Sequence, residues 1–112
     1  MEIAILIFDR LTALDAVGPY DVLANLPGAK ISFVGERKGS VRTAHKSLGL
    51  EADFAIDEVT SADVLLVPGG IGEEAVRAKP AMLEWVRAIH ATTQWTTTVC
   101  TGALILGAAG GL

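Results

Sequence analysis

The chain has 112 residues, of which 51% are hydrophobic and 20% are charged, and its formal net charge is -4. This composition supports a packed core in a single domain over residues 1–112 and excludes disordered and fibrous classes. The excess of acidic over basic residues argues against binding nucleic acid or an anionic membrane by charge alone. Cys100 is the only cysteine, which rules out an internal disulfide, and no signal-peptide pattern opens the chain, so we expect a cytoplasmic protein.

Short apolar runs alternate with helical patterns along the chain. The runs predict strands at 3–8, 31–34, 64–67 and 95–99, with short extended pieces around 41–42 and 48–50, and the helical patterns predict helices at 15–26, 73–77, 80–90 and 101–109. Continuous β-branched runs are typical of strands that are buried on both faces. The alternation therefore predicts an α/β fold, a doubly wound, mostly parallel sheet of flavodoxin-like type.

Ligands of doubly wound sheets bind beyond the carboxyl ends of the strands. Three predicted loops arrive at that edge, at residues 9–15, 68–71 and 100–102. These loops are therefore the candidates for a functional site.

Cys100 lies where a predicted strand runs directly into a predicted helix, with Gly102 two residues later. This is the sequence form of a nucleophile elbow, in which a sharp turn exposes the side chain and the start of the helix favours the thiolate. Free cysteine is also among the most buried residue types, so a packing role is an equal alternative.

Two further loops supply possible partners for Cys100. Gly69 and Gly70 interrupt a buried strand, and their N–H groups are candidates for an oxyanion hole, although such pairs also form ordinary turns. Asp15 opens a predicted helix among apolar residues, where it is either an N-cap or a proton-handling carboxyl beside the thiol.

The remaining sequence features add no cofactor chemistry. His45 and His90 lie in polar surroundings where solvation is the simpler expectation, and no His or Cys pair has metal-ligand spacing. The glycines form neither a dinucleotide fingerprint nor a P-loop. We therefore predict no cofactor, no metal and no membrane span.

Three blocks of the sequence are LDAVGPYDVL at 14–23, DVLLVPGG at 63–70 and TVCTGA at 98–103. Together they resemble the DJ-1/PfpI superfamily, which has a class I glutamine-amidotransferase-like fold, and within it the isonitrile hydratases. The resemblance implies a hydro-lyase that converts an isonitrile into an N-substituted formamide through a cysteine nucleophile, without a cofactor.

The resemblance also implies roles for individual residues. Cys100 would attack the isonitrile carbon, Asp15 would handle protons or position water, and Thr101 would assist through its hydroxyl or N–H group. Gly70, together with Gly69 and Ile71, would bind the substrate. The expected partners are a small-molecule substrate and a second copy of the chain in a homodimer.

Members of this superfamily continue for several more strands and helices, and this chain ends in an apolar stretch without charge after Arg87. The expectation is that residues 1–112 are the N-terminal portion of a longer domain, incomplete at the C-terminal end, with impaired activity. Two alternatives remain: another cysteine-dependent hydrolase of the superfamily, or the ligand-sensing module of an AraC-type transcription regulator. No helix-turn-helix segment is present for binding DNA directly.

Overall fold

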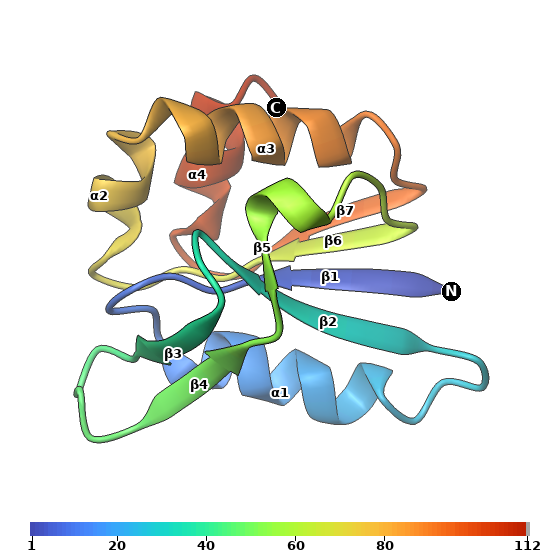
Figure 1. Ribbon diagram of the computed structural model, residues 1–112, viewed down its shortest axis with the longest axis horizontal. Helices are drawn as coiled ribbons and strands as arrows, with labels where there is room; N and C mark the ends of the chain where they lie inside the picture. The colour runs from blue at the N-terminus through green and yellow to red at the C-terminus, as the bar shows by residue number, and fades with distance from the viewer. Residues whose placement is uncertain (112) are drawn as a thin grey trace.

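A five-stranded sheet forms the centre of the structure, a computed structural model that describes residues 1–111 (Figure 1). Leu112, the last residue of the predicted domain, lies outside the described residues. All strand pairs in the sheet are parallel, and the order is β5-β2-β1-β6-β7. The strands are β1 (Glu2–Leu6), β2 (Lys30–Gly35), β5 (Phe54–Ala55), β6 (Val64–Val67) and β7 (Trp95–Thr98).

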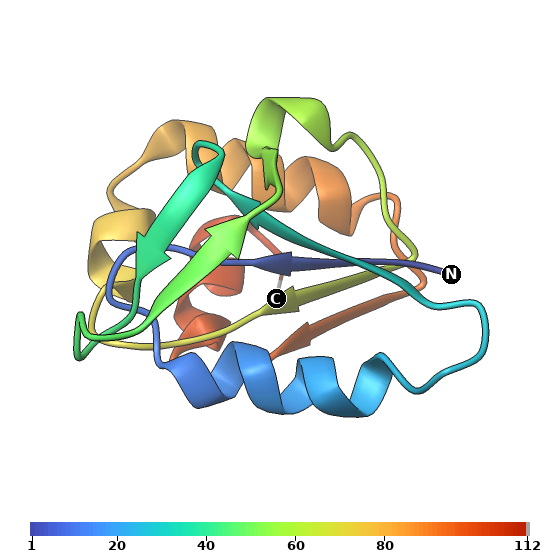
Figure 2. The same ribbon diagram turned by 60° about the horizontal axis from the view of Figure 1, so that its bottom comes forward.

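Helices cover both faces of this sheet (Figures 1 and 2). Helix α1 (Ala13–Leu23) lies on one face, and α2 (Glu73–Arg77), α3 (Pro80–His90) and α4 (Gly102–Ala108) lie on the other. This is the doubly wound, mostly parallel α/β fold that the alternating pattern predicts. None of the helices among residues 1–111 is long and apolar enough to cross a membrane.

Burial follows from coverage on both faces. Ile3, Ile5 and Leu6 of β1 and all four residues of β6 are buried, which explains why these runs contain no polar alternation. On α3, the buried stripe includes Trp85, whose indole N–H donates to the Val59 carbonyl at 2.9 Å. Leu83 on the same helix is only half-buried.

Two elements were absent from the prediction. Strand β5 has two residues and pairs with β2 through Val34 and Phe54, and the 3-10 helix η1 (Ile56–Glu58) follows it. Neither is long enough to show a periodic pattern. The predicted strand at 3–8 ends at Leu6, yet the N–H of Ile7 still donates to the Val34 carbonyl at 2.8 Å.

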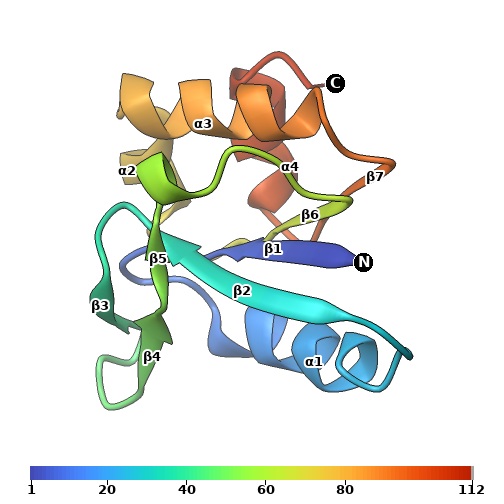
Figure 3. The same ribbon diagram turned by 45° about the vertical axis from the view of Figure 1, so that its right-hand side comes forward.

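A small antiparallel hairpin of β3 (Gly39–Arg42) and β4 (Gly49–Ala52) lies beyond the carboxyl ends of β1 and β2, separate from the central sheet (Figure 3). It is joined to the loop after β1, because the Arg10 N–H donates to the Arg42 carbonyl at 2.7 Å and the Ala44 N–H donates to the Leu11 carbonyl at 2.9 Å. The hairpin thereby becomes part of the wall at the edge of the sheet where ligands bind in this architecture.

Candidate functional site

Cys100 occupies the turn between β7 and α4 in a strained backbone conformation. Its φ is 53°, in the left-handed region that residues other than glycine, asparagine and aspartate rarely adopt. Its side chain is exposed. A strained, exposed residue between a strand and a helix is the geometry of a nucleophile elbow, and strain of this kind gathers at functional sites.

The turn depends on two glycines that allow close backbone approach. A Cβ at Gly102 would overlap the carbonyl oxygen of Val67, so the start of α4 lies directly on the end of β6. A Cβ at Gly69 would lie 2.5 Å from Thr101 Oγ1 and 2.6 Å from the Thr101 nitrogen. The loop after β6 and the turn after β7 are therefore in backbone contact, which brings their residues to one place.

Asp15 reaches the same place from α1. It lies in the first turn of α1, where the residue at the N-cap position is Thr12, and its side chain is only 6% exposed. One carboxylate oxygen, Oδ2, accepts from the Gly69 N–H at 3.4 Å, and the other, Oδ1, accepts from the Cys100 thiol at 3.7 Å. The structure therefore aims Asp15 at the thiol and does not use it as the helix cap.

Asp15 changes the ionisation that we expected for Cys100. The sequence predicted that the start of α4 would favour the thiolate. Instead the pKa of Cys100 is raised, first because the thiol donates a hydrogen bond to Asp15, then because the carboxylate is negatively charged, and also because the thiol is partly desolvated. The resting site is thus a neutral thiol paired with an acceptor for its proton.

The N–H of Gly70 donates to the hydroxyl oxygen of Thr101 at 3.0 Å. Gly70 has a φ of 135°, and a Cβ there would lie 2.6 Å from the Thr12 nitrogen, so the loop requires glycine at this position. Because the Thr101 oxygen accepts this bond, its own proton is left to donate elsewhere. That Gly69 and Gly70 present N–H groups to a substrate anion stays a prediction, since both N–H groups already have protein acceptors.

A hollow of about 360 Å³ surrounds the thiol and opens widely to solvent. We call it the Cys100 hollow; its lining residues are Thr12, Gly70, Ile71, Glu73, Glu74, Cys100 and Thr101. Ile71 is 69% exposed at its edge.

Thr12, Glu73 and Glu74 line this hollow and were not among the site residues predicted from the sequence. Glu73 is 8% exposed and accepts two bonds from Arg77, from Nε at 2.6 Å and from Nη2 at 3.1 Å. The hydrogen bond to Glu73 raises the pKa of Arg77. The only sequence signal was the i,i+4 spacing of this ion pair, which is common on helix surfaces.

Neither histidine lies in the Cys100 hollow. His90 is at the end of α3, where its Nδ1 lies 2.7 Å from Thr96 Oγ1, and His45 is exposed in the β3–β4 turn. Within residues 1–111, no group of three or more His, Cys, Asp or Glu side chains is placed to hold a metal ion.

The chain is similar to known proteins in both sequence and fold. The model of the DJ-1/PfpI family matches residues 1–112. Isonitrile hydratase from Pseudomonas putida is 36% identical over 110 residues, which are 98% of this chain and 48% of that protein. The crystal structure of a ThiJ/PfpI family protein from Pseudomonas syringae has a TM-score of 0.94 at 33% identity, over 99% of this chain and 46% of that one.

A shorter match is to an HTH-type transcriptional regulator from Mycobacterium tuberculosis, with 44% identity over 48 residues, 43% of this chain and 18% of that protein. The chain thus spans about half the length of the hydratase and of the crystallised relative that it matches.

Proposed function

The chain belongs to the DJ-1/PfpI family, and we propose that its Cys100 site hydrates isonitriles to N-substituted formamides. The observation that carries the proposal is the hydrogen bond of 3.7 Å from the Cys100 thiol, on a strained elbow, to the buried carboxylate of Asp15. The similarity to an isonitrile hydratase supports the choice of substrate class.

The first step forms a covalent intermediate. Cys100 Sγ bonds to the terminal carbon of the isonitrile while Asp15 accepts the thiol proton and delivers it to the same carbon, which gives a thioimidate. The raised pKa of Cys100 fits this order, because the proton leaves only as the sulfur attacks. One carboxylate therefore acts first as base and then as acid.

The second step releases the product. Asp15 takes a proton from water as the water oxygen adds to the thioimidate carbon, the electrons of the C=N bond move to nitrogen, and Asp15 passes that proton to the nitrogen. The C–S bond then breaks while the remaining hydroxyl proton of the intermediate passes through Asp15 to the sulfur, and the formamide leaves. Thr101 stabilises the charge that develops on nitrogen by donating a hydrogen bond, because the bond from Gly70 leaves its hydroxyl proton available.

Mass spectrometry of the intact chain with cyclohexyl isocyanide tests the first step. We expect an adduct equal in mass to the isonitrile on the wild type, no adduct on Cys100→Ser, and slower adduct formation by about 100-fold or more in Asp15→Asn. Asp21→Asn, an exposed change on the same helix, is the matched control. The absence of both adduct and formamide in the wild type contradicts the proposal, as does an adduct that survives Cys100→Ser.

A second candidate function is a ligand-sensing module of a transcription regulator, favoured by the match of 48 residues to such a protein. In that role the Cys100 hollow binds a small molecule without converting it. Saturable binding of the isonitrile that persists in Cys100→Ser, with no adduct on the wild type, would favour this function.

We also propose that the chain forms a homodimer. Helix α1 exposes large apolar side chains to solvent: Leu14 is 73% exposed and Val22 is 69% exposed. Clusters of exposed apolar side chains are typical of association surfaces. Sedimentation equilibrium should give twice the chain mass of 11.7 kDa. A monomer at all concentrations would contradict this proposal.

A further inference from the structure

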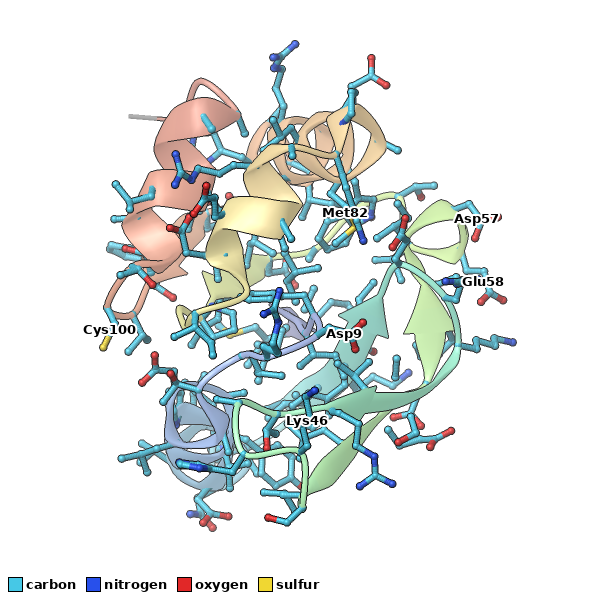
Figure 4. All side chains as sticks on the ribbon, turned by 90° about the vertical axis from the view of Figure 1, so that its left-hand side faces the viewer. Asp9, Lys46, Asp57, Glu58, Met82 and Cys100 are labelled. Atoms are coloured by element: carbon cyan, nitrogen blue, oxygen red, sulfur yellow. The ribbon has the colours of Figure 1, made fainter. Side chains whose placement is uncertain are left out.

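A second cavity, of about 280 Å³, lies beside the Cys100 hollow. One loop separates the two: Gly70 and Ile71 line the Cys100 hollow, and Gly72 lines the second cavity. Gly72 lies directly on the loop after β1, because a Cβ there would overlap the carbonyl oxygen of Asp9. Figure 4 shows Asp9 and Cys100 on the same end of the molecule but well apart. The two sites are neighbours with separate linings.

The floor of the second cavity is formed by buried apolar residues, and the rest of its lining is polar or charged. The buried apolar residues come from the segment after β1, from β3, from α2 and from α3, and they are Ile7, Phe8, Val41, Val76 and Met82. Figure 4 shows Met82 above Asp9. A floor of this kind binds the hydrocarbon part of a ligand.

Two ion pairs fix the walls. Lys79 Nζ lies 2.9 Å from Glu36 Oε1, which joins the end of β2 to the start of α3, and Lys38 Nζ lies 3.1 Å from Glu58 Oε2 on η1. The hydrogen bond from Lys79 lowers the pKa of Glu36. Each pair balances its own charge, so these four residues add little net field to the cavity.

Two charges of opposite sign remain on the rim. Asp9 and Arg37 both line the cavity, and among residues 1–111 neither side chain forms a hydrogen bond or an ion pair, although the charge of Arg37 also helps to lower the pKa of Glu36. They come from the loops after β1 and β2, the edge at which parallel sheets bind ligands. A carboxylate and a guanidinium that are free of protein hydrogen bonds above buried apolar residues match a ligand that carries both charges.

We propose that this cavity binds a small zwitterion with an apolar body, such as an apolar α-amino acid. The ligand's ammonium group bonds to the carboxylate of Asp9, its carboxylate bonds to the guanidinium of Arg37, and its hydrocarbon part rests on the floor. A ligand with only a negative charge meets repulsion from Asp9, and one with only a positive charge meets repulsion from Arg37. The volume suits a molecule at the small end of the usual range.

Calorimetric titration of the full chain with L-leucine tests the proposal. We expect saturable binding that weakens by about tenfold or more in Asp9→Asn and in Arg37→Gln, since each change removes one charge-assisted bond. The matched controls Asp21→Asn and Lys30→Gln, which change exposed residues outside the cavity, should leave affinity unchanged.

Three comparison ligands separate the parts of the recognition. We expect 4-methylpentanoate, which lacks the ammonium group, and 3-methylbutylamine, which lacks the carboxylate, to bind at least about tenfold more weakly than leucine. Glycine, which lacks the apolar body, should also bind more weakly. Failure of leucine to bind, equal affinity of either singly charged analogue, or unchanged affinity in both rim variants would overturn the proposal.

Binding to this cavity is also separable from the proposed hydratase chemistry. Leucine should bind Cys100→Ser as tightly as the wild type, because the thiol lines only the neighbouring hollow. Competition between leucine and an isonitrile for one site would place the amino acid in the Cys100 hollow and contradict the assignment.

Discussion

We expect Cys100→Gly to be more stable than Cys100→Ala. Both variants lose the thiol and its hydrogen bond to Asp15, so this loss cancels in the comparison. They differ in how they tolerate the φ of 53° at this position, which alanine resists and glycine adopts freely. The comparison therefore isolates the backbone strain of the elbow.

The expected difference is the balance of two terms. A left-handed conformation costs a residue with a Cβ about 1–2 kcal/mol. Glycine loses more chain entropy on folding than alanine, which costs about 0.5–1 kcal/mol. With the middle value of each range, the net advantage of glycine is about 0.75 kcal/mol, which corresponds to roughly 3–6 °C in Tm for a domain of this size.

Thermal and urea unfolding of the two variants under reducing conditions measure this difference. Lys46 has a φ of 61° at an exposed turn, so Lys46→Gly should likewise be more stable than Lys46→Ala. Leu104 is 50% exposed within α4, and there glycine should be less stable than alanine by about 1 kcal/mol. If alanine equals or exceeds glycine at position 100 while both controls behave as expected, the elbow is not strained and our reasoning fails.

Two further predictions concern the same site. The rate of Cys100 alkylation by iodoacetamide should rise with pH, and the midpoint of this rise should lie at lower pH in Asp15→Asn than in the wild type, because Asp15 raises the pKa of the thiol. An equal midpoint in the two proteins would show that Asp15 does not raise this pKa. Gly102→Ala should destabilise the chain by about 1–3 kcal/mol in denaturant titration, because the new Cβ overlaps the Val67 carbonyl oxygen. Leu104→Ala, at a side chain that is 50% exposed on the same helix, should cost less stability than Gly102→Ala, and equal losses at the two positions would refute the packing argument.

Local patterns predicted most of the elements. The helices at 73–77 and 80–90 begin and end where the sequence placed them, the second with Pro80 at its first turn. The buried strand at 64–67 was also identified within its bounds. Strand β5 was not predicted, because its two residues form a strand only through pairing with β2, and no local sequence pattern indicates that pairing.

The candidate site was also predicted in part from the sequence. The order of strand, Cys100, Gly102 and helix predicted an elbow, and the structure has the positive φ that such a turn requires. The role of Asp15 was left open between a helix cap and a partner of the thiol. The two residues are 85 positions apart, and only the folded chain brings their side chains together.

By itself the sequence determined the fold class and the loops at the carboxyl edge of the sheet, and it made Cys100 a candidate elbow, because these depend on periodicity and turn chemistry over a few neighbouring residues. Tertiary structure alone decided what surrounds the thiol. The order β1-β6-β7 places α1 and the turn after β7 on either side of the loop after β6, so that the carboxylate of Asp15 meets Cys100. That contact raises the pKa of the thiol through the hydrogen bond to Asp15 and the negative charge of its carboxylate, whereas the start of a helix favours the thiolate.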